Sequence, residues 1–143
     1  MAEKKLFCAF HTAGRLFGFD IRCVKEIITE FQITPVFHAP DGVLGYMNLR
    51  GQIHVILDLK QILGFSGAGT NAQGCIIIFK HSISEPFGVL VEKVEDIYEI
   101  SGDLYEKDSV SGTPNALTCG YCKLSDGLMV ILDPLLILNN LKT

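Results

Sequence analysis

Two cysteines three residues apart, Cys119 and Cys122, are the nearest approach to a chemical motif in the sequence. A redox dithiol opens a helix after a strand, and a zinc site needs two further ligands at suitable spacing. Residues 118–124 instead have the pattern of a strand that enters a turn at 125–127. Residues three apart in a strand point to opposite faces, so we expect two ordinary strand cysteines. A small redox or metal protein that uses this pair is the alternative from another functional class.

No other set of residues predicts catalysis or cofactor binding. Residues 67–72 match the dinucleotide pattern G-x-G-x-x-A, but here a helix precedes and a strand follows, the reverse of the order that the motif needs. The histidines lack the spacing of a metalloprotease site, and no G-x-S-x-G sequence occurs. His54 alternates with Ile53 and Val55 in an expected strand, which predicts a surface or partner-facing imidazole. We therefore expect no enzyme, no catalytic residue, no metal and no cofactor.

Composition excludes further classes. The 143 residues include 12 basic and 16 acidic side chains, a net charge of −4, which argues against a nucleic-acid binder. Hydrophobic residues make up 48% of the chain, yet the most apolar stretch, 127–141, is interrupted by Asp133 and Pro134 before it could span a bilayer. The start of the sequence lacks the apolar core of a signal peptide. Five cysteines, an odd number, fit a reducing cytoplasm.

The elements that must position any site are short strands. Apolar residues alternate over ten segments separated by Gly, Asp, Asn and Pro, which predicts an all-β barrel or sandwich. Residues 13–14, 50–51 and 126–127 have the composition of tight hairpin turns. Short helices are expected after the capping residues Asp58 and Asp133, and a further short piece at 21–25. The expected strands are residues 6–12, 15–20, 26–35, 44–49, 52–57, 75–80, 86–91, 94–100, 118–124 and 128–132. Residues 65–74 and 103–115 are expected loops.

An internal repeat divides the chain. Residues 45–63 align without a gap on residues 120–138, and 9 of the 19 positions are identical. Both copies read as strand, turn, strand, aspartate cap and helix. Either similar hairpin units have converged, or the chain holds two related small barrels. The arginine at the first turn, Arg50, faces Ser125 in the second copy. Since the shared hairpin does not require it, Arg50 is a candidate for function rather than folding, and interfaces favour arginine.

The sequence resembles the CheW family of chemotaxis coupling proteins. The resemblance is carried by residues 18–28 (GFDIRCVKEII), 33–36 (ITPV), 39–51 (APDGVLGYMNLRG), 55–59 (VILDL), 87–91 (FGVLV) and 124–133 (LSDGLMVILD). It implies two five-stranded barrels of the Src-homology type, with subdomains at about 1–66 and 67–143 and strand exchange between the halves left open. It also implies an adaptor that joins the cytoplasmic tip of chemoreceptors to the regulatory domain of the histidine autokinase CheA, in arrays at the inner face of the cell membrane, without insertion into the membrane.

The resemblance also implies site residues. A groove between the barrels would take the receptor helix hairpin, lined by Val24, Gly45, Asn48, Leu49 and Arg50. The apolar side of the hairpin would enter the groove, and Arg50 would fix its register.

Kinase contact is expected on the first barrel, with Ile21 as an apolar anchor and Glu26 as a polar rim group. The alternatives are that Ile21 is a core residue and that Glu26 is a solvated carboxylate. Two departures from the usual family pattern are Glu92, where an aspartate is common, and His54, where an apolar residue is usual. A coupling protein of a non-motility chemosensory pathway is the alternative within the family.

Overall fold

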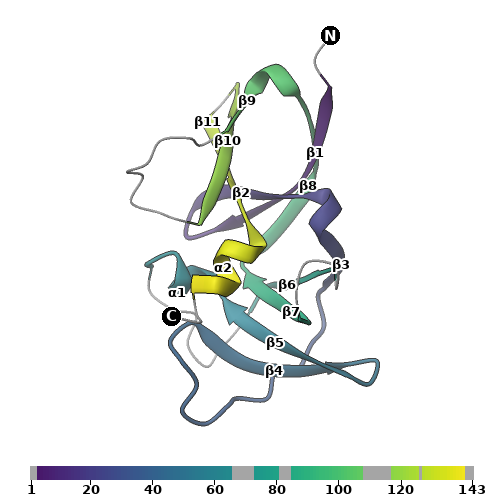
Figure 1. Cartoon of the computed structure of the whole chain (residues 1–143), viewed down its shortest axis with the longest axis vertical. Helices are drawn as coiled ribbons and strands as arrows, with labels where there is room; N and C mark the ends of the chain where they lie inside the picture. The colour runs from purple at the N-terminus through teal and green to yellow at the C-terminus, as the bar shows by residue number, and fades with distance from the viewer. Residues whose placement is uncertain (1–2, 66–72, 81–84, 108–116, 126, 141–143) are drawn as a thin grey trace.

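The computed structural model describes residues 3–65, 73–80, 85–107, 117–125 and 127–140 (Figure 1). These residues form eleven strands, two short α-helices and two 3-10 turns. The strands are β1 (Lys4–Thr12), β2 (Arg15–Asp20), β3 (Val24–Ile28), β4 (Val43–Leu49), β5 (Gln52–Asp58), β6 (Cys75–Phe79), β7 (Phe87–Val91), β8 (Lys93–Ser101), β9 (Tyr105–Lys107), β10 (Thr118–Leu124) and β11 (Gly127–Leu132). The helices are α1 (Leu59–Ile62) and α2 (Pro134–Asn140), and the 3-10 turns are η1 (Ile21–Cys23) and η2 (Gly102–Leu104).

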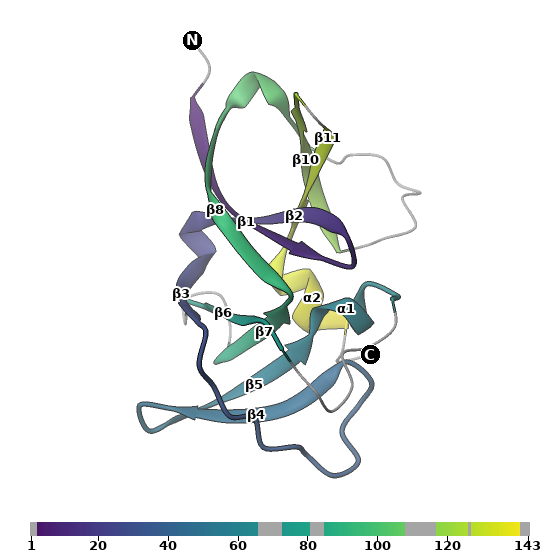
Figure 2. The same ribbon diagram turned by 180° about the vertical axis from the view of Figure 1, so that it is seen from behind.

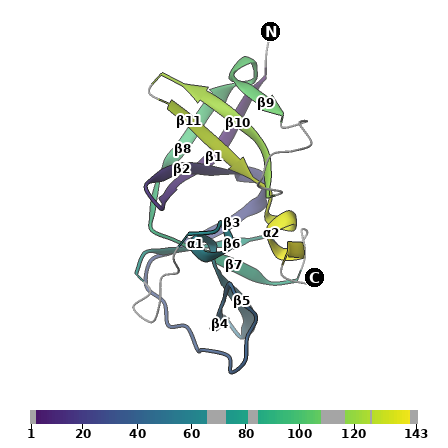
Figure 3. The ribbon, with the colours of Figure 1, turned by 90° about the vertical axis from the view of Figure 1, so that its left-hand side faces the viewer.

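The strands form two sheets, one above the other in Figures 1 and 2. The six-stranded sheet has the order β8-β1-β2-β11-β10-β9, and the five-stranded sheet has the order β3-β6-β7-β5-β4. The six-stranded sheet therefore joins the first two strands to the last four, so the sheets draw on both sides of the expected boundary near residue 66. The division into two subdomains stays a prediction. Both helices lie at the level between the sheets (Figure 3).

The all-β class is confirmed, with two differences in the strands. The six-stranded sheet has one strand more than expected, because residues 105–107, placed in a loop from sequence, pair with the edge of β10. The expected strand 26–35 begins at Val24 and ends at Ile28, and only an isolated bridge joins Thr34 to Tyr46. The reason is topological. After β3, which pairs with β6 at one edge of the sheet, the chain must cross to β4 at the opposite edge, so residues 29–35 cannot stay paired with β6.

The apolar residues form three cores, because the sheets pack against each other and each also encloses a core of its own. Along β6, Ile77 and Phe79 enter the core shared by both sheets, whereas Ile76 and Ile78 enter the core of the five-stranded sheet. Strands buried on both faces read as continuous apolar runs rather than as alternation. The high apolar content of the sequence follows from this arrangement.

The internal repeat is a structural repeat. The β4–β5 and β10–β11 hairpins have the same register 75 residues apart, so that Tyr46 faces Val55 and Tyr121 faces Val130. Each hairpin also pairs in parallel with a Phe-Gly strand at the same place, Ile56 with Gly88 and Ile131 with Gly18. This agreement supports the interpretation as two related units. Both expected caps are present, since the Asp58 carboxylate accepts from Gln61 N and the Asp133 carboxylate from Leu135 N.

The cysteine pair lies on β10, as expected, but the expected opposite orientation is wrong. A register shift between Thr118 and Gly120 interrupts the alternation, and Cys119 and Cys122 both contact the core enclosed by the six-stranded sheet. Both thiols are free, and burial raises the pKa of each, that of Cys122 to about 11. A raised pKa keeps them as thiols, the poor form for metal binding or attack. The dinucleotide-like residues 67–72 lie outside the described residues.

None of the helices in the described ranges is long and apolar enough to cross a membrane.

Candidate functional site

Arg50 occupies the turn of the β4–β5 hairpin and pairs with Glu26 on β3. Arg50 Nη1 lies 2.7 Å from Glu26 Oε1 and Nη2 lies 2.9 Å from Oε2, a two-point contact that fixes the guanidinium plane. Arg50 and Gly51 both have positive φ, 53° and 85°, as a two-residue type I′ hairpin turn requires. Asn48 Oδ1 accepts from Gly51 N at 2.9 Å and stabilises the same turn. The turn thus presents Arg50 in one orientation at the end of the hairpin.

The pair is asymmetric in its exposure. The Arg50 side chain is 66% exposed, whereas the Glu26 side chain is 25% exposed. Hydrogen bonds from the guanidinium lower the pKa of the Glu26 carboxyl below its usual range, so Glu26 is ionised at neutral pH. Arg50 is therefore fixed by its ion pair with the less exposed Glu26, while much of its guanidinium and apolar stem stays accessible to a partner.

The lowered pKa of Glu26 predicts a pH dependence. A carboxylate with a lowered folded-state pKa stabilises the fold above the ordinary glutamate pKa of about 4.3, and this contribution is lost as the pH falls through the lowered value. In a carbon-detected NMR titration, Glu26 should ionise below the usual glutamate range in the native chain and within that range in Arg50→Gln. Equal midpoints in the two proteins would show that the pair does not persist in solution.

An exposed apolar strip lies beside the arginine. Val55 packs against the shared core, and Ile53, two residues earlier on β5, lies on the same face but is 52% exposed. Across the hairpin, Asn48 is the partner of Ile53, and Tyr46, which is 37% exposed, is the partner of Val55. We call Tyr46, Asn48, Arg50 and Ile53 the docking face. It lies on the same face of the β4–β5 hairpin as Val55, which packs against the core shared by the sheets, but beyond the part that the six-stranded sheet covers.

Sequence reasoning missed Tyr46 and Ile53. The available signal was the two-residue alternation along β5, which places Ile53 on the same face as Val55. That alternation does not show which face of β5 the six-stranded sheet leaves uncovered. The same choice of face made the expectation for His54 wrong. His54 is 1% exposed, opposite Met47 and inside the five-stranded sheet, with Nδ1 3.1 Å from the carbonyl oxygen of Gln52.

Three of the expected receptor-binding residues are wholly or partly buried beneath the docking face rather than exposed on it. Gly45 is buried, and a side chain there would collide with the carbonyl of Thr34. Leu49 packs half-buried against the core of the five-stranded sheet, and Val24 is buried in the shared core. Asn48 and Arg50 remain as the exposed members of the expected set. The role assigned to each stays a prediction.

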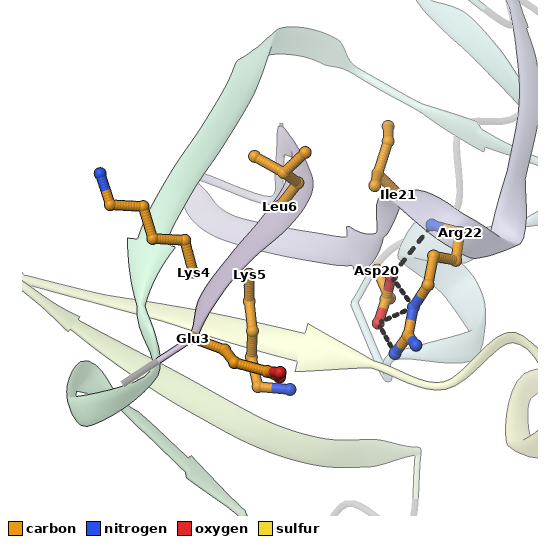
Figure 4. Close-up of a pocket in the computed structure, with 7 residues that line it drawn as sticks. All are labelled: Glu3, Lys4, Lys5, Leu6, Asp20, Ile21 and Arg22. Carbon is orange, nitrogen blue, oxygen red and sulfur yellow. Dashed lines mark hydrogen bonds and ion pairs between the residues drawn. The ribbon is translucent and has the colours of Figure 1, made fainter. Parts of the chain in front are cut away.

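The expected kinase-binding residues lie on adjacent elements. Ile21 lines a pocket of about 220 Å³ between the start of β1 and the β2–η1 corner, together with Leu6 and the Asp20–Arg22 ion pair (Figure 4). Arg22 Nη2 lies 2.7 Å from Asp20 Oδ2, and hydrogen bonds from Arg22 lower the pKa of the Asp20 carboxyl. Glu26, a few residues later, faces Arg50 instead. Residues 20–26 therefore connect the pocket to the docking face.

In the part of the chain that the structure describes, no three His, Cys, Asp or Glu side chains form a group that could hold a metal ion.

Comparison with known proteins decides the family. The family model of the CheW-like domain matches residues 7–142. The chain belongs to the CheW-like family. This CheW-like chain is 27% identical to the scaffolding protein TtCheW from Thermoanaerobacter tengcongensis, with a TM-score of 0.82 over 94% of this chain and 92% of that one.

Curated relatives of the CheW-like chain are also similar in sequence. It is 37% identical over 93 residues to the chemotaxis protein CheW of Rhizobium meliloti, a match that covers 65% of this chain and 59% of the relative. It is 26% identical over 125 residues to the chemotaxis protein CheW of Thermotoga maritima, covering 87% and 82%. The match thus spans less than two thirds of the Rhizobium protein and most of the Thermotoga protein.

Proposed function

We propose that the chain is a non-catalytic adaptor of chemotaxis, which joins the cytoplasmic tip of chemoreceptors to the regulatory domain of the histidine autokinase CheA. Membership of the CheW-like family supports the adaptor role. The observation that carries the proposal is the docking face, where Arg50, fixed by its ion pair with Glu26, lies beside the exposed side chains of Tyr46 and Ile53. Such a chain would work in the cytoplasm, at receptor arrays on the inner face of the membrane.

The chemistry of the docking face fits an amphipathic receptor helix. An amphipathic helix binds by laying its apolar side on an apolar groove, and Ile53 and Tyr46 supply the exposed apolar surface. The exposed guanidinium of Arg50 supplies hydrogen bonds at the edge, where planar donor geometry selects orientation. Gly45, Leu49 and Val24 would maintain the backbone that carries these side chains.

The pocket beside Ile21 is the proposed contact with the kinase. It offers the Ile21 and Leu6 side chains together with the charged Asp20 and Arg22 pair. Glu26, on the neighbouring β3, lies outside the pocket, paired with Arg50, and would be a polar rim group of the same kinase contact. With no chemical step of its own, the adaptor would transmit receptor state by binding different partner conformations with different affinity.

Co-sedimentation tests the proposal. A receptor cytoplasmic fragment assembled on vesicles, CheA and the chain are mixed and pelleted. We expect CheA in the pellet only when the chain is present, in proportion to the chain added. An unrelated acidic β-protein of similar size is the control. Pelleting of CheA that does not depend on the chain would contradict the proposed function.

A further inference from the structure

A polar junction joins the two sheets at the β1–β2 turn. Glu92, which follows β7, accepts a hydrogen bond from Ala13 N through Oε1 at 3.0 Å. The same oxygen lies 3.4 Å from Nζ of Lys60 on α1. One carboxylate oxygen thus connects the first hairpin of the six-stranded sheet to the helix that caps the five-stranded sheet.

A small recess lies at this junction, lined by Thr12, Asp58, Lys60 and Glu92 among others, with a volume of about 20 Å³. One water molecule needs roughly 10–15 Å³ of such volume and two to four polar partners. The recess is large enough for one water molecule, and the four polar side chains named above contribute to its wall.

The Thr12 hydroxyl supplies the independent observation. Thr12 is 1% exposed and lies on the face of β1 that carries Cys8 and Phe10 into the shared core. Its Oγ1 has no hydrogen-bond partner among the described residues. A buried hydroxyl without a partner is costly, so its retention at the wall of a polar recess indicates a ligand that it bonds.

We propose that this recess binds one water molecule, which hydrogen-bonds the Thr12 hydroxyl and links β1 to the Asp58 cap of α1. The charges that line the recess favour a neutral ligand: the Lys60 ammonium opposes a cation, and the Asp58 and Glu92 carboxylates oppose an anion. The water completes the polar junction between the sheets. It is independent of the proposed receptor and kinase contacts.

Substitution of Thr12 tests the water site through the sign of the stability change. Thr12→Val removes the hydroxyl at nearly constant shape. If the hydroxyl bonds a water, the thermal midpoint should fall by roughly 3 °C, the size expected for one lost hydrogen bond in a chain of this length. Thr12→Ser keeps the hydroxyl and should keep the water. An unchanged or higher midpoint in Thr12→Val would overturn the proposal, because removing an unbonded buried hydroxyl is neutral or favourable.

A direct readout accompanies the midpoints. Water-selective NMR cross-relaxation should give a signal from a long-lived water at the Thr12 and Ala13 amides in the native chain and in Thr12→Ser, but not in Thr12→Val. Absence of the signal in the native chain, or its persistence in Thr12→Val, would overturn the proposal whatever the midpoints.

Discussion

Replacing Arg50 by glutamate is expected to weaken binding of the receptor fragment by about tenfold or more, the loss typical of an interface anchor. The side chain is 66% exposed at the end of the β4–β5 hairpin, beside Ile53 and Tyr46. Its replacement puts a carboxylate where a helix flank would meet a guanidinium. The measurement is titration of the receptor fragment with each purified chain.

The ion pair with Glu26 dictates the control. Arg50→Glu alone places two carboxylates at the contact that Arg50 and Glu26 now form, so part of any defect could come from a displaced turn. The double variant Glu26→Arg with Arg50→Glu restores opposite charges at the same two positions. We expect it to recover the thermal midpoint of the native chain but not receptor binding. If the exchanged pair bound the receptor as tightly as the native chain, Arg50 would serve only to order the hairpin.

Gly88→Ala is expected to lower the free energy of unfolding by about 3 kcal/mol, at the upper end of what overpacking of a core costs. A Cβ at Gly88 would lie 2.8 Å from Ile78 Cδ1 and 2.9 Å from the carbonyl oxygen of Ile77. That carbonyl belongs to β6, which is paired with β7, so it cannot move without loss of strand pairing. A loss of this size is a large fraction of the total stability of a small domain.

Gly18→Ala is the matched comparison, because Gly18 holds the equivalent place in the other half of the repeat. A Cβ there would meet the ends of side chains, Met129 Sδ at 3.1 Å and Ile131 Cδ1 at 3.2 Å. Such groups can rotate away, so we expect a loss of about 1 kcal/mol. Urea unfolding of both variants measures the difference, and equal losses would contradict this account of the two sites.

The sequence allowed prediction of much of the fold because the informative patterns were local. Two-residue alternation located ten of the strands, and the repeat indicated two related hairpins, whose register is the same in the structure. Residues 105–107 were missed because three residues are too few to display an alternation. The end of β3 was misplaced because its partner β6 lies about fifty residues later, and no local pattern reveals where that pairing stops.

The candidate site was only partly predictable for the same reason. Arg50 stood out because the repeat offers a copy of the turn without it. Its contact with Glu26 could not be read from sequence, since it depends on where β3 and the hairpin meet in space. Ile53 and His54 illustrate the limit most simply. Alternation separated them onto opposite faces, but only the packing of the second sheet decides which face is buried.

The order of strands in the two sheets also has a consequence for how the chain folds. All five strands of the five-stranded sheet lie between Val24 and Val91, so this sheet can pair as one continuous stretch of chain. The six-stranded sheet pairs β2 with β11, more than a hundred residues later, and such distant contacts form slowly. Phe17, whose strand partner on β11 is Val130, therefore lacks that neighbour until β11 has been synthesised. During that interval, rather than in the native state, the chain is most exposed to aggregation.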